Sequence, residues 1–261
     1  MPDVRVGEVD LYYELIDCSE PWRSGHAPVV LLHGLGTDRR MWLYQIPALC
    51  PRMPVLAVDL RGHGRSTAPD GDWGIADMAR DVVRLLRHLG AEKAHLVGLS
   101  MGGMVAQQFA LDFPYATASL VLADTASRVD PAAARESLQF MESHSMRDIA
   151  TTRITTAFSD AVNPVMRGHL IEQVSLNDKD AYVRAARAVF GFDVQARLAE
   201  IAAPTLVIMG EADRTFPMDS MTSLGSAIRG ARVACLAGAG HISNMERPQE
   251  FNRAVIDFLG V

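Results

Sequence analysis

Residues 96–103 read Leu96-Val97-Gly98-Leu99-Ser100-Met101-Gly102-Gly103, an apolar run that closes in the pattern Gly-x-Ser-x-Gly. The residues before the serine are typical of a strand and the apolar residues after it of a helix, which is the context that a nucleophile elbow requires. A serine at such a bend has a strained backbone, and the glycines two residues before and after it remove side chains that would clash. Its hydroxyl then projects from the sheet, and the following helix directs backbone N–H groups toward a reacting oxygen. An ordinary glycine-rich turn can contain the same five residues, so the interpretation depends on the rest of the chain.

Length and composition are those of an ordinary globular protein. The 261 residues suffice for one large α/β domain or for one domain with an insertion, and 49% of them are hydrophobic against 21% charged. The formal net charge of −6 argues against a basic surface that binds nucleic acid or membranes. The sequence contains no run of 18 or more apolar residues, so we expect no membrane-spanning helix. The first residues lack the pattern of a signal peptide. We therefore expect a cytoplasmic protein.

The cysteines and histidines predict neither a disulfide framework nor a metal site. Cys18, Cys50 and Cys235 are odd in number, far apart and without metal-ligand spacing, which indicates a reducing compartment. The eight histidines form no pair of the His-Glu-x-x-His type.

Short apolar runs recur along the chain, with helical patterns between them. The run Val29-Val30-Leu31-Leu32 is typical of a strand buried on both faces of a parallel sheet. Further strands are expected at residues 55–58, 94–99, 120–123, 205–209 and 232–236, and an antiparallel pair is expected at 4–6 and 11–15. This alternation predicts an α/β fold with a mostly parallel, eight-stranded sheet flanked by helices.

The alternation is interrupted over residues 127–198, where the pattern predicts helices only. We interpret this all-helical insertion as a lid, because open α/β sheets bind ligands at the carboxyl edge that it would cover. The core domain would then comprise residues 1–126 and 199–261. The candidates for the roof of a pocket are Met141, Met146, Phe158, Met166, Phe190 and Phe192. An equally good interpretation of each is that it only packs within the lid. Trp42, in a helical stretch after the third strand, is a further candidate for the substrate pocket.

Three polar residues, Ser100, Asp213 and His241, each follow an expected parallel strand. Right-handed crossovers keep the carboxyl ends of such strands on one edge, so these residues should converge there. The order nucleophile, acid, histidine is the one expected of an α/β-hydrolase. His241 would accept the proton of Ser100, and Asp213 would orient the imidazole. Asp124, which also follows a strand, is the alternative acid.

The strand at 29–32 ends in His33-Gly34-Leu35-Gly36. In serine hydrolases of this architecture, a loop after the third strand supplies one N–H of the oxyanion hole and the residue after the nucleophile supplies the other. We assign these donors to the backbones of Leu35 and Met101. A phosphate-binding turn is the competing interpretation, but the Lys-Ser/Thr pair of such a turn is absent. His33 is expected to hold the loop by hydrogen bonds.

A second loop, residues 59–66, reads Asp-Leu-Arg-Gly-His-Gly-Arg-Ser. Its arginines, Arg61 and Arg65, would suit a substrate carboxylate, but ion pairs within the loop are the preferred interpretation.

Together these motifs resemble those of the α/β-hydrolase superfamily over nearly the full length of the chain. The segments 32–42, 98–105 and 241–248 are most similar to those of 3-oxoadipate enol-lactonases. The resemblance implies a cofactor-free hydrolase of a small ester or lactone, with Ser100, Asp213 and His241 as the catalytic triad. The expected partner is the small-molecule substrate, and association into a homodimer is left open.

Other activities use the same fold and triad. We expect a serine esterase or lactonase with an acyl-enzyme intermediate, and the alternatives within the enzyme class are a general carboxylesterase, a cofactor-free haloperoxidase or perhydrolase, and a C–C bond hydrolase. An alternative of another class is a small-molecule receptor that turns its ligand over slowly. The turnover rate separates the receptor from an enzyme, whose kcat should reach about 1 s⁻¹ or more.

Overall fold

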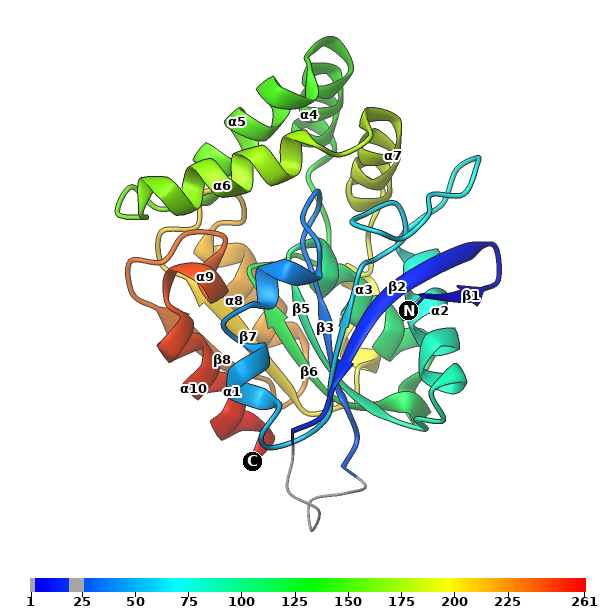
Figure 1. The fold of residues 1–261 in the computed structure, drawn as a ribbon. Helices are drawn as coiled ribbons and strands as arrows, with labels where there is room; N and C mark the ends of the chain where they lie inside the picture. The colour runs from blue at the N-terminus through cyan, green and yellow to red at the C-terminus, as the bar shows by residue number, and fades with distance from the viewer. Residues whose placement is uncertain (1–2, 19–25) are drawn as a thin grey trace.

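A single eight-stranded sheet forms the centre of the protein in the computed structural model, which describes residues 3–18 and 26–261 (Figure 1). The strands are β1 (Asp3–Val6), β2 (Val9–Ile16), β3 (Val29–Leu32), β4 (Val55–Val58), β5 (Ala94–Leu99), β6 (Thr117–Ala123), β7 (Thr205–Gly210) and β8 (Arg232–Leu236). Their order in the sheet is β1-β2-β4-β3-β5-β6-β7-β8. Strand β2 is antiparallel to β1 and β4, and the other neighbours are parallel. The predicted mostly parallel α/β fold is confirmed.

Helices cover both faces of the sheet. The helices packed on one face are α2 (Ile75–His88), α3 (Met101–Asp112) and α8 (Met218–Ala227), and those on the other are α1 (Ile46–Leu49) and α10 (Pro248–Leu259). Short helical elements lie in the loops: η2 (Arg39–Trp42), η3 (Pro114–Ala116), η4 (Gln195–Glu200) and α9 (Ser243–Glu246). One apolar cluster lies between the sheet and helices α2, α3 and α8, and a second lies between the sheet and helices α1 and α10. In β3, Val30 and Leu32 belong to the first cluster, whereas Val29 and Leu31 belong to the second. Because successive side chains alternate between two covered faces, the whole strand is apolar.

A four-helix segment, residues 131–190, lies over the carboxyl edge of the sheet (Figure 1). It consists of α4 (Pro131–Ser143), α5 (Met146–Ala157), α6 (Pro164–Ser175) and α7 (Lys179–Phe190). Each of its helices begins after a residue whose side chain accepts a backbone hydrogen bond from the first turn: Asp130, Ser145, Asn163 and Asp178. Such caps satisfy N–H groups that have no partner within the helix, which explains why a segment with few long apolar runs is helical.

The strand register aligns the carboxyl ends of the central strands. Leu99 pairs with Ala123, Ala123 with Ile208, and Gly210 with Leu236. The loops after β5, β6, β7 and β8 therefore leave the sheet at the same edge, beneath the four-helix segment. None of the helices in the described part of the chain combines the length and the apolar character needed to cross a membrane.

Candidate active site

Ser100 occupies a sharp bend between β5 and α3. Its backbone has φ 55° and ψ −118°, a conformation that costs free energy for a residue with a side chain and is common at functional sites. Two glycines make the bend sterically feasible. A Cβ on Gly98 would lie 2.2 Å from the carbonyl oxygen of Gly102, and a Cβ on Gly102 would lie 1.9 Å from that of Leu32. The hydroxyl of Thr125, in the loop after β6, donates to the carbonyl oxygen of Ser100 at 2.7 Å and so supports the bend.

Hydrogen bonds connect Ser100, His241 and Asp213. The distance from Ser100 Oγ to His241 Nε2 is 2.9 Å, and that from His241 Nδ1 to Asp213 Oδ2 is also 2.9 Å. The other carboxylate oxygen of Asp213 accepts from the backbone N–H groups of Thr215 and Phe216 at 2.7 and 3.1 Å. This arrangement orients the imidazole, with one nitrogen toward the hydroxyl and the other toward the carboxylate.

Electrostatics around His241 favour its protonated form. Burial on its own lowers the pKa of His241, but the charge of Asp213 and its hydrogen bond outweigh this effect and raise the pKa above its ordinary value of 6.5. A histidine with a raised pKa is a stronger base, and it also holds the proton that a leaving group later needs.

Asp124, the alternative acid, is buried beside the triad but forms different hydrogen bonds. Its Oδ1 accepts from the N–H of Gly210 at 2.8 Å, and its Oδ2 accepts from the hydroxyl of Ser243 at 2.5 Å. Burial raises the pKa of Asp124 to about 7, although the nearby His241 opposes this shift. Asp124 therefore connects the ends of β6 and β7 with α9, and Asp213 is the acid in contact with the imidazole.

Leu35 and Met101, the two residues expected to supply the N–H donors of an oxyanion hole, both lie near Ser100. Met101 is the first residue of α3, where an N–H has no partner within the helix. Leu35 lies in the loop after β3 and lines the same cavity as Ser100. Neither N–H has a hydrogen-bond partner in the described part of the chain.

His33 holds this loop in place. One ring nitrogen accepts from the N–H of Leu60 at 3.0 Å, and the other is 2.8 Å from the carbonyl oxygen of Gly34. Complete burial lowers the pKa of His33 to about 4. The ring is therefore neutral near pH 7 and acts as a structural group, as the sequence analysis expects.

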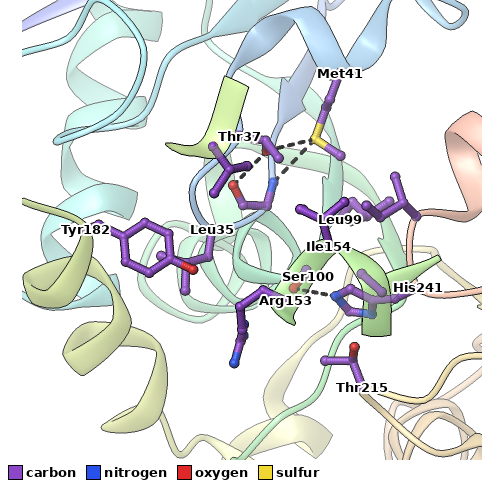
Figure 2. A pocket seen from close by; sticks show the side chains of 14 residues that line it. Leu35, Thr37, Met41, Leu99, Ser100, Arg153, Ile154, Tyr182, Thr215 and His241 are labelled. Carbon is purple, nitrogen blue, oxygen red and sulfur yellow. Dashed lines mark hydrogen bonds between the residues drawn. The ribbon is translucent and has the colours of Figure 1, made fainter. Parts of the chain in front are cut away.

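Two adjoining cavities lie at the site, and Ser100 lines only the inner one. The inner one, of ≈50 Å³, contains Ser100 and His241 together with Leu35 and two side chains of the four-helix segment, Arg153 and Tyr182 (Figure 2). The outer one, of ≈390 Å³, lies between α4 and α5 and shares Arg153 and Thr215 with the inner one. The site is thus a small chamber beside the serine with a wider cavity next to it.

Residues 29–254 match the sequence profile described as the Alpha/beta hydrolase family. The chain belongs to this family. It is 32% identical to 3-oxoadipate enol-lactonase 2 of Acinetobacter baylyi over 87% of this chain and 86% of that protein. It is 33% identical to the RutD protein of Variovorax paradoxus, whose name describes a carbamate hydrolase, over 88% and 91% of the two chains.

Solved structures include a similar hydrolase. The enol-lactonase from Burkholderia xenovorans LB400 superimposes with a TM-score of 0.93 over the full length of both chains, at 31% identity. The expected resemblance to α/β-hydrolases that include enol-lactonases is therefore confirmed.

Most of the pocket residues expected from the sequence lie elsewhere. Met141 lines the outer cavity. Trp42 is fully buried and packs against Phe251 of α10, and Phe158 is fully buried in the same apolar cluster. Phe190 packs between the two apolar clusters. These three side chains contribute to the core and line neither cavity, because apolar side chains near the site also hold the helices against one another and against the sheet.

The structure also corrects the expectation for the loop at 59–66. Arg61 pairs with Asp81 of α2 through two hydrogen bonds of 2.6 and 2.8 Å, and Asp59 accepts from Arg39. The ion pairs thus reach outside the loop, and Arg61 is 2% exposed and not free to bind a substrate. The residues that the sequence analysis missed are Arg153 and Tyr182, since nothing in their helical patterns marks the face that turns to the cavity.

Within residues 3–18 and 26–261, no group of three or more His, Cys, Asp or Glu side chains is arranged to hold a metal ion.

Proposed function

We propose that this α/β-hydrolase cleaves a small carboxylic ester or lactone through an acyl-enzyme intermediate. The observation that carries the proposal is the hydrogen-bonded series Ser100–His241–Asp213 at the wall of a small cavity. The two enol-lactonases at 31–32% identity support a lactone as the substrate class.

The first half of the reaction forms the acyl-enzyme. Ser100 Oγ attacks the carbonyl carbon while His241 Nε2 takes the hydroxyl proton, and Asp213 stabilises the imidazolium that results. The carbonyl oxygen becomes an oxyanion and accepts hydrogen bonds from the N–H groups of Leu35 and Met101. When the tetrahedral intermediate collapses, the C–O bond breaks and His241 returns the proton to the leaving alkoxide. In a lactone this alcohol stays attached to the acyl group.

The second half releases the acid. A water molecule gives its proton to His241 and attacks the acyl carbon, and the C–O bond to Ser100 breaks with return of the proton to Oγ. The net reaction adds one water and yields a carboxylic acid and an alcohol. Because an engineered cavity of about 150 Å³ holds a benzene molecule, the ≈50 Å³ beside Ser100 suits a small acyl group.

A carbamate is the second candidate substrate, favoured by the similarity to RutD proteins. The same triad would attack the carbamate carbonyl, and the leaving group would be an amine.

Initial rates on a substrate panel test the proposal. The panel contains p-nitrophenyl acetate to octanoate, several small lactones including an enol-lactone, and a carbamate, each with the wild type and with Ser100→Ala. A matched control is Ser226→Ala, an exposed serine of α8 whose hydroxyl bonds only to a carbonyl oxygen of its own helix. Turnover that requires Ser100 and is fastest on a lactone supports the proposal. Serine-dependent turnover of the carbamate alone favours the second candidate, and no serine-dependent turnover contradicts both.

A further inference from the structure

Two cysteines from separate parts of the chain lie side by side. Cys18 lies just after the end of β2, and Cys50 directly follows α1. The backbone N–H of Cys18 donates to the carbonyl oxygen of Cys50 at 3.1 Å, and the two thiols are hydrogen-bonded to each other. A backbone contact of this length holds the two Cα atoms at roughly the 4.4–6.8 Å that a disulfide spans. The two sulfurs can therefore be joined without a large movement of the backbone.

Regular secondary structure holds the backbone on both sides of this pair. Ile16, at the end of β2, pairs with Val55 of β4 in the antiparallel register. The N–H of Cys50 donates to the carbonyl oxygen of Ile46 at 2.9 Å and so continues the turn of α1. Because each cysteine adjoins an element that is fixed to the core, the contact between the two thiols is a property of the fold.

The two thiols differ in their access to solvent. Cys18 is exposed, whereas Cys50 is 8% exposed and belongs to the apolar cluster between the sheet and helices α1 and α10. Burial, the adjacent Cys18 thiol and the charge of Asp17 raise the pKa of Cys50, so this thiol is protonated near pH 7. An oxidant in solution therefore meets Cys18 first, and Cys50 is placed to react with the product formed on Cys18.

Cys235, the third cysteine of the chain, lies far from this pair. It is exposed on β8 and pairs with Met209 of β7. Strand β8 is the last strand of the sheet, whereas β2 is the second, and neighbouring strands are about 4.8 Å apart. Cys235 is thus an exposed thiol on the same protein that cannot reach Cys18 or Cys50, and it serves as an internal comparison.

We propose that Cys18 and Cys50 form a reversible disulfide when the protein meets a peroxide. The thiolate of Cys18 attacks one oxygen of hydrogen peroxide, the O–O bond breaks, and the departing hydroxide takes up the Cys18 proton as water. The resulting sulfenic acid is attacked by the sulfur of Cys50. The S–O bond breaks, and the hydroxide that leaves takes up the Cys50 proton as a second water. Two thiols are oxidised to one disulfide, and one peroxide is reduced to two waters.

This modification site is independent of hydrolysis at Ser100. Neither the end of β2 nor α1 contributes a residue to the triad or to the two cavities. In a reducing compartment the pair stays as two thiols, and a dithiol reopens the bond by thiol–disulfide exchange. Because the bond restricts the unfolded chain between residues 18 and 50, the oxidised protein should have a Tm about 4–8 °C higher.

Oxidation followed by peptide mapping tests the proposal. The purified protein is treated with hydrogen peroxide, denatured, alkylated and digested without reductant for mass spectrometry. The expected product is a peptide in which Cys18 is linked to Cys50 of the same molecule, with one of the three thiols still open to alkylation. The Tm should rise as this peptide forms, and dithiothreitol should reverse both changes.

Two serine variants assign the bond. Cys18→Ser, at an exposed position, should give no linked peptide and leave Cys50 open to alkylation after denaturation. Treated with peroxide in the same way, this variant also accounts for any effect of methionine oxidation on Tm. Cys235→Ser is the matched control, because it removes the other exposed thiol, and it should keep both the linked peptide and the rise in Tm.

Other products of the same reaction overturn the inference. A sulfinic acid on Cys18 beside an unreacted Cys50 would show that the buried sulfur cannot reach the oxidised one. A disulfide between two molecules through Cys18 or Cys235, seen as a dimer on a non-reducing gel, would show that the contact does not direct the reaction. Three unreacted thiols, at a peroxide concentration that converts glutathione to its disulfide, would show that Cys18 is not reactive.

Discussion

The parallel sheet and the four-helix segment above it contribute to the site in different ways. The sheet contributes residues whose backbone geometry is determined by strand ends. Ser100 lies in its strained bend, and one carboxylate oxygen of Asp213 accepts from two backbone N–H groups. The four-helix segment contributes long side chains from helix surfaces, Arg153 and Tyr182. A helix surface can change side chains without altering the bend or the strand register. From this comparison we expect bond cleavage to depend on the sheet edge and the choice of substrate to depend on the helices.

Removing the nucleophile should have the largest effect. Ser100→Ala should lower kcat/KM by about 10⁴-fold or more on every substrate of the panel, because no other group can form the acyl-enzyme. The measurement is the initial rate at saturating and at low substrate concentration, with circular dichroism to confirm the fold. If the variant retained a tenth of the wild-type rate, the chemistry would not reside at the sheet edge.

Exchanging the two buried carboxyls for amides distinguishes their roles at the same edge. Asp213→Asn should lower kcat by up to about 10⁴-fold, since an amide stabilises the wrong tautomer of His241. Asp124→Asn should lower kcat by less than about 10-fold, because Asp124 bonds to Gly210 and Ser243 and not to the imidazole. Rates of the purified variants on one substrate decide between them. A larger loss in Asp124→Asn would make it the acid of the triad.

The pH dependence follows from the raised pKa of His241. The free enzyme needs a neutral imidazole, so kcat/KM should rise about tenfold per pH unit below the pKa of His241 and level off above it, at a pH higher than 6.5. In Asp213→Asn the midpoint of the residual activity should move to lower pH, because the carboxylate that raises the pKa is gone. A midpoint that stays in place would mean that another group controls the profile.

Stability should change with pH in the opposite direction. A folded-state pKa above the unfolded value means that the contribution of His241 to the free energy of unfolding is complete below about pH 6.5 and is lost as the pH rises through the folded-state pKa. Urea unfolding at several pH values, compared with His241→Gln, measures this contribution.

The sequence predicts the sheet edge well because its signals are local. The run at 29–32 is apolar on both faces, the elbow has its two glycines, and parallel register brings the strand ends together. The helical segment is harder to predict, because burial there depends on contacts between residues far apart in the chain. From the sequence alone, Arg61 could bind a substrate carboxylate. The structure shows that Asp81, 20 residues further along the chain, already pairs with it. The sequence alone also allows Trp42 to be a pocket residue, and only the structure shows that it packs against Phe251.

The smallest effect is expected where the two regions join. Glu246 of α9 accepts hydrogen bonds from the N–H of Gly240, next to His241, and from the backbone and hydroxyl of Ser159, just after α5. Glu246→Gln keeps the shape and removes the charge, so the unfolding free energy should fall by about 1–3 kcal/mol. For a chain of this size the corresponding fall in Tm is roughly 2–6 °C. Activity should fall less than about 10-fold, because Glu246 touches neither the triad nor the cavity.

Differential scanning calorimetry and rates on the substrate panel measure both effects of Glu246→Gln. Glu250→Gln, an exposed carboxylate in the first turn of α10, is the control and should change Tm by less than about 2 °C. If Glu246→Gln lowers Tm while the rates on the panel change by less than about 10-fold, the junction stabilises the contact between the residues after α5 and the loop of His241 without setting the geometry of the triad. If the rates on the panel fall by more than about 100-fold, the junction instead positions His241. The expected division between a sheet that cleaves and helices that select then fails at Glu246.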